Sequence, residues 1–343
     1  MKNERNFSAY LLTDRATRRY FSGVDLAEGI LLVGENKIYF ADRRYYLLLF
    51  EKLKGTDVKT VPFESLADVK RVLEENKTEK LLVDYSVTTV EEYEKYKGLG
   101  LPIENAKPIL DETRAVKSED ELAKIKKACE IIEQAFYKTL PKIREGVTET
   151  EIKSVLEKEC SLLGAEGQSF ETIVAFGENT AVPHHETGET KLKRNEPVLI
   201  DAGVFYKGYA SDFTRTVFYG TPSDEFKRVY NAVLSANELA EEKIVAGMTA
   251  KDADGIAREE LKIKGYGDKF THSLGHGVGL EIHEFPYISK KCGYVLRDGN
   301  VFTVEPGAYL DYKFGVRIED TVFICGGKVK RFFTDEKKLV ILK

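Results

Sequence analysis

The chain has 343 residues, of which 42% are hydrophobic and 32% charged, and its 52 Lys and Arg are nearly balanced by 57 Asp and Glu. This length suggests about two folded domains, and a mildly acidic chain without a long basic block is not expected to bind nucleic acid. The sequence has no uncharged apolar run long enough to cross a bilayer and no signal-peptide pattern after its charged start, so we expect a cytoplasmic protein with no membrane partner.

Short apolar runs alternate with helical patterns in the first third of the chain. The runs lie at residues 9–12, 29–33, 37–40 and 81–83. This alternation predicts an α/β domain with an at least partly parallel sheet. A capping-box pattern at Ser118 then opens an amphipathic helical stretch that reaches about Leu140,. We therefore place a domain boundary near residues 111–118, with an α/β domain over 1–115 and a second domain over 116–343.

The second domain contains an internal repeat. The echoed segments are 142–148 (KIREGVT) with 243–249 (KIVAGMT), and 198–203 (VLIDAG) with 302–307 (FTVEPG). The second echo puts Asp201 and Glu305 at the same position of two apolar strands. The repeat predicts two similar α+β halves around a pseudo-two-fold axis, with acids from both halves meeting between them.

The first predicted hairpin turns at Lys207 and Gly208. A turn there pairs residues that are equally distant from it, which places Asp212 opposite Gly203. Gly203 shares a strand face with Asp201, so the two carboxylates become diagonal neighbours. Side chains at that spacing can converge on a pair of metal ions.

The second predicted hairpin repeats this device. Glu305 and Glu319 are equally distant from a polar loop centred near Tyr312, so they face each other across the two strands,. Four clustered carboxylates repel one another and raise one another's pKa unless a cation neutralises them. The two hairpins together therefore predict a metal site.

The histidines support this interpretation, because all five lie in the second domain: His184, His185, His272, His276 and His283. Three of them are interleaved with Gly275, Gly277 and Gly279, which suggests that the backbone approaches another group closely there. The glycine spacing does not match GxGxxG, and the sequence has no P-loop, GxSxG or HExxH motif. Nucleotide binding and serine-hydrolase chemistry are therefore not favoured.

These stretches resemble the pita-bread-fold metallopeptidases, in the branch of Xaa-Pro aminopeptidase (aminopeptidase P) and prolidase. The matching segments are IDAG at 200–203, SDFTRT at 211–216, GHGVGL at 275–280, HEFP at 283–286, TVEPG at 303–307 and VRIED at 316–320. The first domain resembles the creatinase-type N-terminal domain, which implies a role in substrate access and dimerisation. The resemblance implies an α+β pita-bread domain with a pseudo-two-fold repeat, preceded by a smaller α/β domain, in a homodimer.

The resemblance also implies a site for two divalent metal ions. Its five ligands would be Asp201, Asp212, His276, Glu305 and Glu319. Asp212 and Glu319 would bridge the ions. Asp201 would hold one of them, and His276 with Glu305 would hold the other. This oxygen-rich set with one imidazole suits Mn²⁺ or Co²⁺, with Zn²⁺ or Fe²⁺ as further possibilities, and the family favours Mn²⁺.

The same resemblance assigns further roles in catalysis. Glu305 would take a proton from the attacking water and pass it to the leaving nitrogen. The residues implied to contact the substrate and the developing oxyanion are His184, His272 and His283. We prefer His184 to the adjacent His185 because it follows a proline, as in the family motif. Arg317, two residues before Glu319, is expected to pair with a liganding acid and orient it.

The family contains enzymes with different substrates. Our main interpretation is an exopeptidase of the aminopeptidase P type, which removes an N-terminal residue that precedes proline in a peptide. The alternative is a prolidase restricted to dipeptides, which needs a cation for the substrate carboxylate. Lys290 and Lys291 are candidates for that cation, although two solvated loop lysines are the simpler explanation of them. A more remote alternative is a non-catalytic binding protein on this fold, which loss of a metal ligand would have favoured. None of the five is lost.

Overall fold

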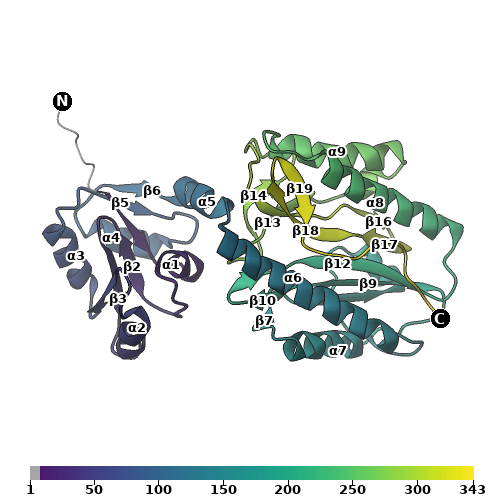
Figure 1. Cartoon of the computed structure of the whole chain (residues 1–343), viewed down its shortest axis with the longest axis horizontal. Helices are drawn as coiled ribbons and strands as arrows, with labels where there is room; N and C mark the ends of the chain where they lie inside the picture. Colours follow the sequence, from purple (N-terminus) through teal and green to yellow (C-terminus); the bar gives the residue numbers. More distant parts are fainter. Residues whose placement is uncertain (1–7) are drawn as a thin grey trace. The chain divides into compact units, whose positions relative to one another are not determined.

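The computed structural model describes residues 8–343 and divides the chain into two compact units, Met1–Thr113 and Arg114–Lys343 (Figure 1). The division falls inside helix α5 (Lys107–Ala115). Each unit has its own sheet and its own apolar core. Among residues 8–343, no helix combines the length and the apolar composition that crossing a bilayer requires.

The first unit is built on a six-stranded sheet in the order β4-β3-β2-β1-β5-β6. Its strands are β1 (Ser8–Leu12), β2 (Ile30–Val33), β3 (Lys37–Ala41), β4 (Val58–Pro62), β5 (Lys80–Val83) and β6 (Ile103–Asn105). Strand β1 is parallel to β5, β3 to β4, and β5 to β6, whereas β2 is antiparallel to both of its neighbours. The prediction of a partly parallel sheet is therefore confirmed.

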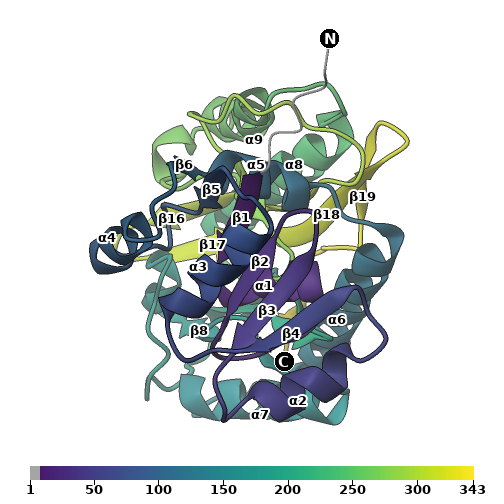
Figure 2. The same ribbon diagram turned by 90° about the vertical axis from the view of Figure 1, so that its left-hand side faces the viewer.

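Helices pack on both faces of this sheet (Figures 1 and 2). Besides α5 they are α1 (Arg15–Ser22), α2 (Tyr46–Leu53), α3 (Leu66–Glu75) and α4 (Val90–Lys97). Buried residues of α3 and α4 contact the face that carries Leu11 and Phe40. Buried residues of α2 and α5 contact the face that carries Leu12 and Tyr39. Because neighbouring residues of a strand point to opposite faces, the short apolar runs fill two separate layers.

The second unit is built on a nine-stranded sheet whose main path runs in the order β14-β13-β15-β18-β12-β9-β8. The strands of this path are β8 (Ile173–Phe176), β9 (Glu196–Ala202), β12 (Phe213–Tyr219), β13 (Gly275–Gly277), β14 (Glu284–Ile288), β15 (Val301–Val304) and β18 (Glu319–Cys325). Two more strands join at its side, β19 (Lys328–Arg331) on β18 and β20 (Ile341–Leu342) on β12. The long helices are α6 (Glu119–Thr139), α7 (Glu149–Leu162), α8 (Asp224–Lys243) and α9 (Ala250–Ile263).

The two halves of this unit repeat one arrangement, as the internal echoes predict. Helices α6 and α7 accompany β8, β9 and β12, whereas α8 and α9 accompany β13, β15 and β18. In Figure 1, α8 and α9 lie at the top of this unit and α6 and α7 lie below them. The echoed threonines Thr148 and Thr249 each cap the helix that follows, α7 and α9. Strand β12 pairs with β18 where the halves meet.

Both hairpins have the predicted register. Lys207 and Gly208 form the first turn with φ angles of 47° and 77°, and Thr214 pairs with Asp201 as a turn at this point requires. In the second hairpin, β16 (Gly307–Leu310) pairs with β17 (Phe314–Arg317) around Tyr312.

Both hairpins change sheets partway, which the sequence analysis did not predict. The chain passes from β11 (Tyr209–Ala210) to β12 at Asp212, from β15 to β16 at Glu305, and from β17 to β18 at Ile318. Strands β16 and β17 form a separate two-stranded sheet, and β11 belongs to a sheet with β10 (Val204–Tyr206) and β7 (Gly167–Gln168). A Cβ atom at Gly203 would lie 2.0 Å from the Ser211 carbonyl oxygen, so only glycine permits this close crossing,.

A buried ion-pair network lies next to the junction of the two halves. The Arg215 guanidinium donates to both Asp335 oxygens at 2.7 Å and to Asp320 at 2.6 Å, and Arg215 is 3% exposed. Arg331 donates to the same two acids at 2.7 and 2.8 Å. These contacts fasten the segment after β19 to β12 and β18. Although burial alone would raise it, the hydrogen bonds from Arg215 lower the pKa of Asp335.

We predict that Asp335→Asn lowers the free energy of unfolding by roughly 3 kcal/mol, because it leaves the buried guanidinium of Arg215 and the partly buried one of Arg331 under-compensated,. Glu336→Gln is the matched control, since this neighbour pairs only with exposed Lys338 and its loss should cost less than about 0.5 kcal/mol,. The folded-state pKa of Asp335 is lowered, so its contribution is present above about pH 4 and disappears as the pH falls through the folded value,. Urea unfolding at pH 7 and pH 3 measures this, and equal stabilities of the two variants at pH 7 would contradict it.

Candidate active site

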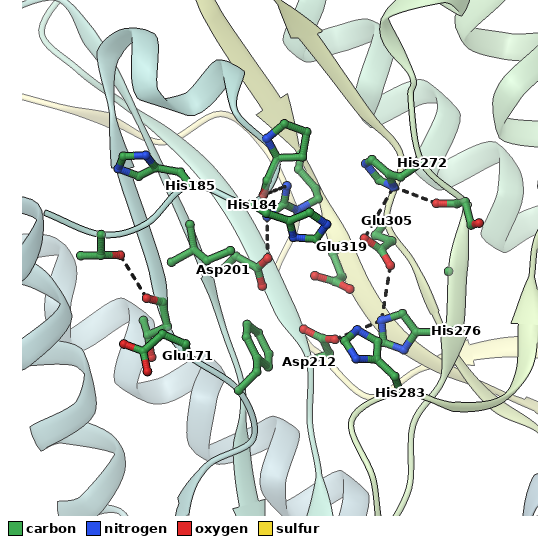
Figure 3. Close-up of a pocket in the computed structure, with 18 of the residues that line it drawn as sticks. Glu171, His184, His185, Asp201, Asp212, His272, His276, His283, Glu305 and Glu319 are labelled. Atoms are coloured by element: carbon green, nitrogen blue, oxygen red, sulfur yellow. Dashed lines mark hydrogen bonds and ion pairs between the residues drawn. The ribbon is translucent and has the colours of Figure 1, made fainter. Parts of the chain in front are cut away.

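One cavity of about 880 Å³ in the second unit contains every site residue that the sequence predicted (Figure 3). The predicted residues in its lining are His184, Asp201, Asp212, His272, His276, His283, Glu305, Arg317 and Glu319. They come from strands of both halves and from the connecting segments near them. The cavity also has an apolar side, with Phe170, Ile173 and Pro183, and Tyr287 lies at its edge.

The possible metal ligands converge most closely at three residues. Asp212, His276 and Glu319 each offer an atom, and these three atoms all lie within 4.8 Å of one another. The His276 Nε2 atom lies 3.5 Å from Asp212 Oδ2 and 3.5 Å from Glu305 Oε1. Asp201 lines the same cavity but is outside this tight cluster. Four of the five predicted ligands are thus close together, because Glu305 lies beside the His276 of this cluster. Asp201, the fifth, lines the same cavity.

The hydroxyls of Thr214 and Thr303 each support one of these acids, Thr214 from the paired strand and Thr303 from two residues earlier in the chain. Thr214, which pairs with Glu319 across the junction of the halves, donates to Glu319 Oε2 at 2.5 Å. Thr303 donates to Glu305 Oε1 at 3.1 Å and accepts from the His276 backbone N–H, also at 3.1 Å. The sequence analysis missed both threonines, since a buried strand threonine has no distinctive spacing from the acid that it supports.

The glycines around His276 explain how its strand fits. A Cβ atom at Gly275 would lie 1.9 Å from the Thr303 carbonyl oxygen, and one at Gly277 would lie 2.5 Å from the Phe285 carbonyl oxygen. The close approach that the sequence predicted is therefore confirmed, and the neighbour is the backbone of adjacent segments. This packing lets β13 enter the sheet beside β15 with the His276 ring turned to the acids.

The electrostatic surroundings oppose ionisation of these acids in the absence of a cation. Burial, followed by the neighbouring acids, raises the pKa of Asp212 and of Glu319 well above their usual values. Burial raises the pKa of Glu305 to about 8, with Arg317 opposing and Asp201 adding to this effect. Burial also lowers the pKa of His276 to about 3, so its imidazole is neutral, which is the form that binds metals,.

The donor set fits a divalent cation. Carboxylate oxygens with one neutral imidazole are ligands for ions such as Mn²⁺, Co²⁺ or Zn²⁺. Asp201 is 9% exposed, and its Oδ1 atom is buried without a hydrogen-bond partner among the described residues. An unsatisfied carboxylate oxygen beside three further acids is costly unless a cation meets it. The arrangement therefore fits the predicted metal centre.

Arg317 lies in a chain of hydrogen bonds behind the acids. Its Nη2 donates to Asp201 Oδ2 at 2.5 Å, and its Nη1 donates to the Tyr309 hydroxyl at 2.8 Å. The acid that Arg317 orients is thus Asp201 of the other half, although Glu319 is nearer in sequence. Tyr309, another residue that the sequence analysis missed, lies 2.9 Å from His272 Nε2.

The three histidines predicted to contact the substrate differ in whether their ring nitrogens are already hydrogen-bonded within the protein. His272 Nδ1 donates to the Ser273 carbonyl at 2.8 Å, and burial lowers the pKa of His272 to about 4, so Nε2 is left to accept from Tyr309,. His283 lies edge-to-face on His276, with 4.2 Å between ring centres. Within the described chain neither His184 nor His283 has a hydrogen-bond partner, so both can donate to a ligand.

Comparison with known proteins agrees with this geometry. Residues 123–325 match the metallopeptidase family M24, and residues 2–116 match the creatinase/prolidase N-terminal domain. A protein of Pyrococcus furiosus named Xaa-Pro dipeptidase is 38% identical over 94% of this chain and 92% of its own length. A solved structure named Xaa-Pro dipeptidase from Bacillus anthracis has a TM-score of 0.93 and 34% identity, covering 97% of this chain and 95% of that one.

A further solved structure has a different name. The X-Pro aminopeptidase from Thermotoga maritima has a TM-score of 0.90 and 37% identity, covering 98% of both chains. These likenesses confirm the predicted fold class, a creatinase-type N-terminal domain followed by a pita-bread catalytic domain. The chain belongs to the metallopeptidase family M24 and is a metal-dependent peptidase.

Proposed function

We propose that this protein is a prolidase, a peptidase that hydrolyses Xaa-Pro dipeptides with two divalent metal ions, most suitably Mn²⁺. The names of relatives from Pyrococcus furiosus and Pyrococcus horikoshii, both Xaa-Pro dipeptidases, support this alternative better than the aminopeptidase P interpretation that the sequence analysis preferred. The observation that carries the proposal is the convergence of Asp212, His276 and Glu319, with Glu305 beside them, in a large cavity.

The residues proposed to hold the two ions are Asp201, Asp212, His276, Glu305 and Glu319. When bound, such ions lower the pKa of water to near neutrality and polarise the scissile carbonyl. Glu305 faces the cavity with 17% of its side chain exposed, so it is the candidate to take a proton from water and deliver it to the leaving nitrogen,. Arg317 would orient Asp201 through its 2.5 Å charge-assisted hydrogen bond,.

The histidines would act on the substrate by hydrogen bonding. His184 and His283 are available at the cavity wall to hydrogen-bond a ligand. A hydrogen bond to the developing oxyanion is worth most in the transition state. Both nitrogens of His272 are already engaged by Ser273 and Tyr309, so its proposed contribution is to hold this wall in place.

The most specific part of the proposal is the length of the peptide substrate. Lys290 and Lys291 do not line the cavity. Among the described residues that line it, Arg317 is the only lysine or arginine. The guanidinium of Arg317 is occupied by Asp201, Tyr309, Thr214 and the Pro183 carbonyl. The cation that the sequence analysis expected for a dipeptide carboxylate is therefore not found among the described lining residues, and the proposal instead gives this carboxylate hydrogen-bond donors such as His283. The dimer and the cytoplasmic location remain predictions.

We predict that metal-stripped protein is inactive and that Mn²⁺ or Co²⁺ restores hydrolysis of Gly-Pro. The assay runs in parallel on an Xaa-Pro-Pro tripeptide. Faster cleavage of the dipeptide supports a prolidase, whereas cleavage of the tripeptide alone would return the assignment to aminopeptidase P. If neither peptide is cleaved with any divalent metal, the peptidase proposal fails and a binding protein on this fold becomes the better explanation.

Two substitutions should separate metal ligands from substrate-contacting residues. Asp212→Asn removes a ligand, so we expect bound metal to fall and kcat/KM to drop on the order of 10³-fold. His283→Ala should leave bound metal unchanged while lowering kcat on the order of 10²-fold, because it removes a transition-state hydrogen bond. Metal analysis of the purified variants and steady-state kinetics measure both effects. Full metal content in Asp212→Asn would argue against its role as a ligand.

A further inference from the structure

The segment between β8 and β9 brings His184 to the cavity. After the short 3-10 helix η2 (Gly177–Ala181) it contains no further helix or strand before β9 begins. His184 is exposed and has no hydrogen-bond partner within the described chain, so no hydrogen bond of its own fixes its position. The position of this ring therefore depends on how the neighbouring residues of the segment are held.

Glu149 at the start of α7 holds this segment. It is completely buried, and its carboxylate accepts four hydrogen bonds. Oε1 accepts from the Phe176 N–H at 2.8 Å and from Asn179 Nδ2 at 2.9 Å. Oε2 accepts from the Gly188 N–H at 3.0 Å and lies 2.9 Å from His185 Nε2. The four donors lie on both sides of His184 in sequence, so one carboxylate closes the segment into a loop.

The chemistry of these contacts requires a carboxylate. Each oxygen receives one backbone N–H, from Phe176 or from Gly188, so a glutamine in either orientation would place its NH₂ group against a backbone donor,. The N-terminus of α7 also favours a negative charge at this position,. Because a carboxylate only accepts, His185 Nε2 carries the proton in this pair,.

The internal repeat indicates that α7 does not need Glu149 in order to form. In the second half the equivalent position after the capping threonine is Ala250, and α9 begins there equally well. That half holds its own histidine segment through Asp254 and Arg258. The Arg258 Nη2 donates to Asp254 and also to the His272 carbonyl, the latter at 2.8 Å. Each half thus has a buried carboxylate on an outer helix that anchors a histidine of the cavity wall.

We infer that Glu149 is a positioning residue for the peptidase reaction, which fixes His184 by closing the loop from Phe176 to Gly188. His185, which lies in the cavity lining but turns its Nε2 to Glu149, belongs to this anchor and does not act on substrate. The inference rests on the proposed function insofar as it gives His184 a role in substrate binding.

The test compares Glu149→Gln with Glu151→Gln, because both remove one charge from the first turn of α7. Among the described residues, the Glu151 carboxylate accepts a hydrogen bond from the Thr148 N–H and makes none with the loop. We expect Glu149→Gln to lower kcat/KM on the order of 10- to 100-fold and Glu151→Gln to leave it near the wild-type value. In a double-mutant cycle, Glu149→Gln should cost little further activity once His184→Ala is present.

A second measurement does not depend on activity. Amide hydrogen exchange across residues 176–188 should be faster in Glu149→Gln than in Glu151→Gln, and His185→Ala should give a smaller change in the same direction. The inference would be overturned if amide exchange in Glu149→Gln were unchanged. It would also be overturned if the activity losses of Glu149→Gln and His184→Ala multiplied fully in the double-mutant cycle. If the wild-type protein cleaves no Xaa-Pro peptide, the proposed function fails, and the exchange result alone decides whether Glu149 anchors the loop.

Discussion

Carboxyl groups crowd together in the interior of the second unit, and this crowding is the constraint on which the rest of the site depends. Asp212 and Glu319 are 4% and 2% exposed, and burial together with neighbouring acids raises the pKa of both. A folded chain keeps such an arrangement only if hydrogen bonds support it and a cation can neutralise it. The hydroxyls of Thr214 and Thr303 supply such hydrogen bonds, and the geometry of the ligand atoms fits a bound cation.

The pseudo-symmetric architecture explains how one chain brings these groups together. Each half supplies a central strand, and β12 and β18 pair directly, so acids from both halves reach the same point. The acids lie where strands leave one sheet for another, which frees their side chains from the regular alternation of a single sheet. Outside this centre, buried carboxylates on α7 and α9 hold the segments that carry His184 and His272. The central strands thus bring together the proposed metal ligands, and anchored loops form the cavity wall.

Residue types and spacings in the sequence were sufficient for much of this account. The turn at Lys207 and Gly208 determines which residues of β9 and β12 are paired, so the neighbouring positions of Asp201 and Asp212 followed from counting along the strands. The echoed segments at 142–148 and 243–249 and the echoed apolar strands likewise predicted two halves. These features depend on local rules of turns and caps, and local rules can be applied without a structure.

Other features depend on contacts between distant segments, and no spacing rule predicts them. The change of sheet at Glu305 results from packing of whole hairpins, and the partner of Arg317 proved to be Asp201 of the other half. Tyr309 and Glu149 have no signature, because each acts by hydrogen-bonding to segments far away in sequence. The proposed preference for dipeptides would also depend on the shape of the cavity, which composition and periodicity do not describe.

The central claim is that acids from both halves form one site for two metal ions. Calorimetric titration of metal-stripped protein with Mn²⁺, checked by elemental analysis of the saturated protein, tests this most directly. The account predicts two ions bound per chain. A saturated protein that binds one ion, or none, would contradict it.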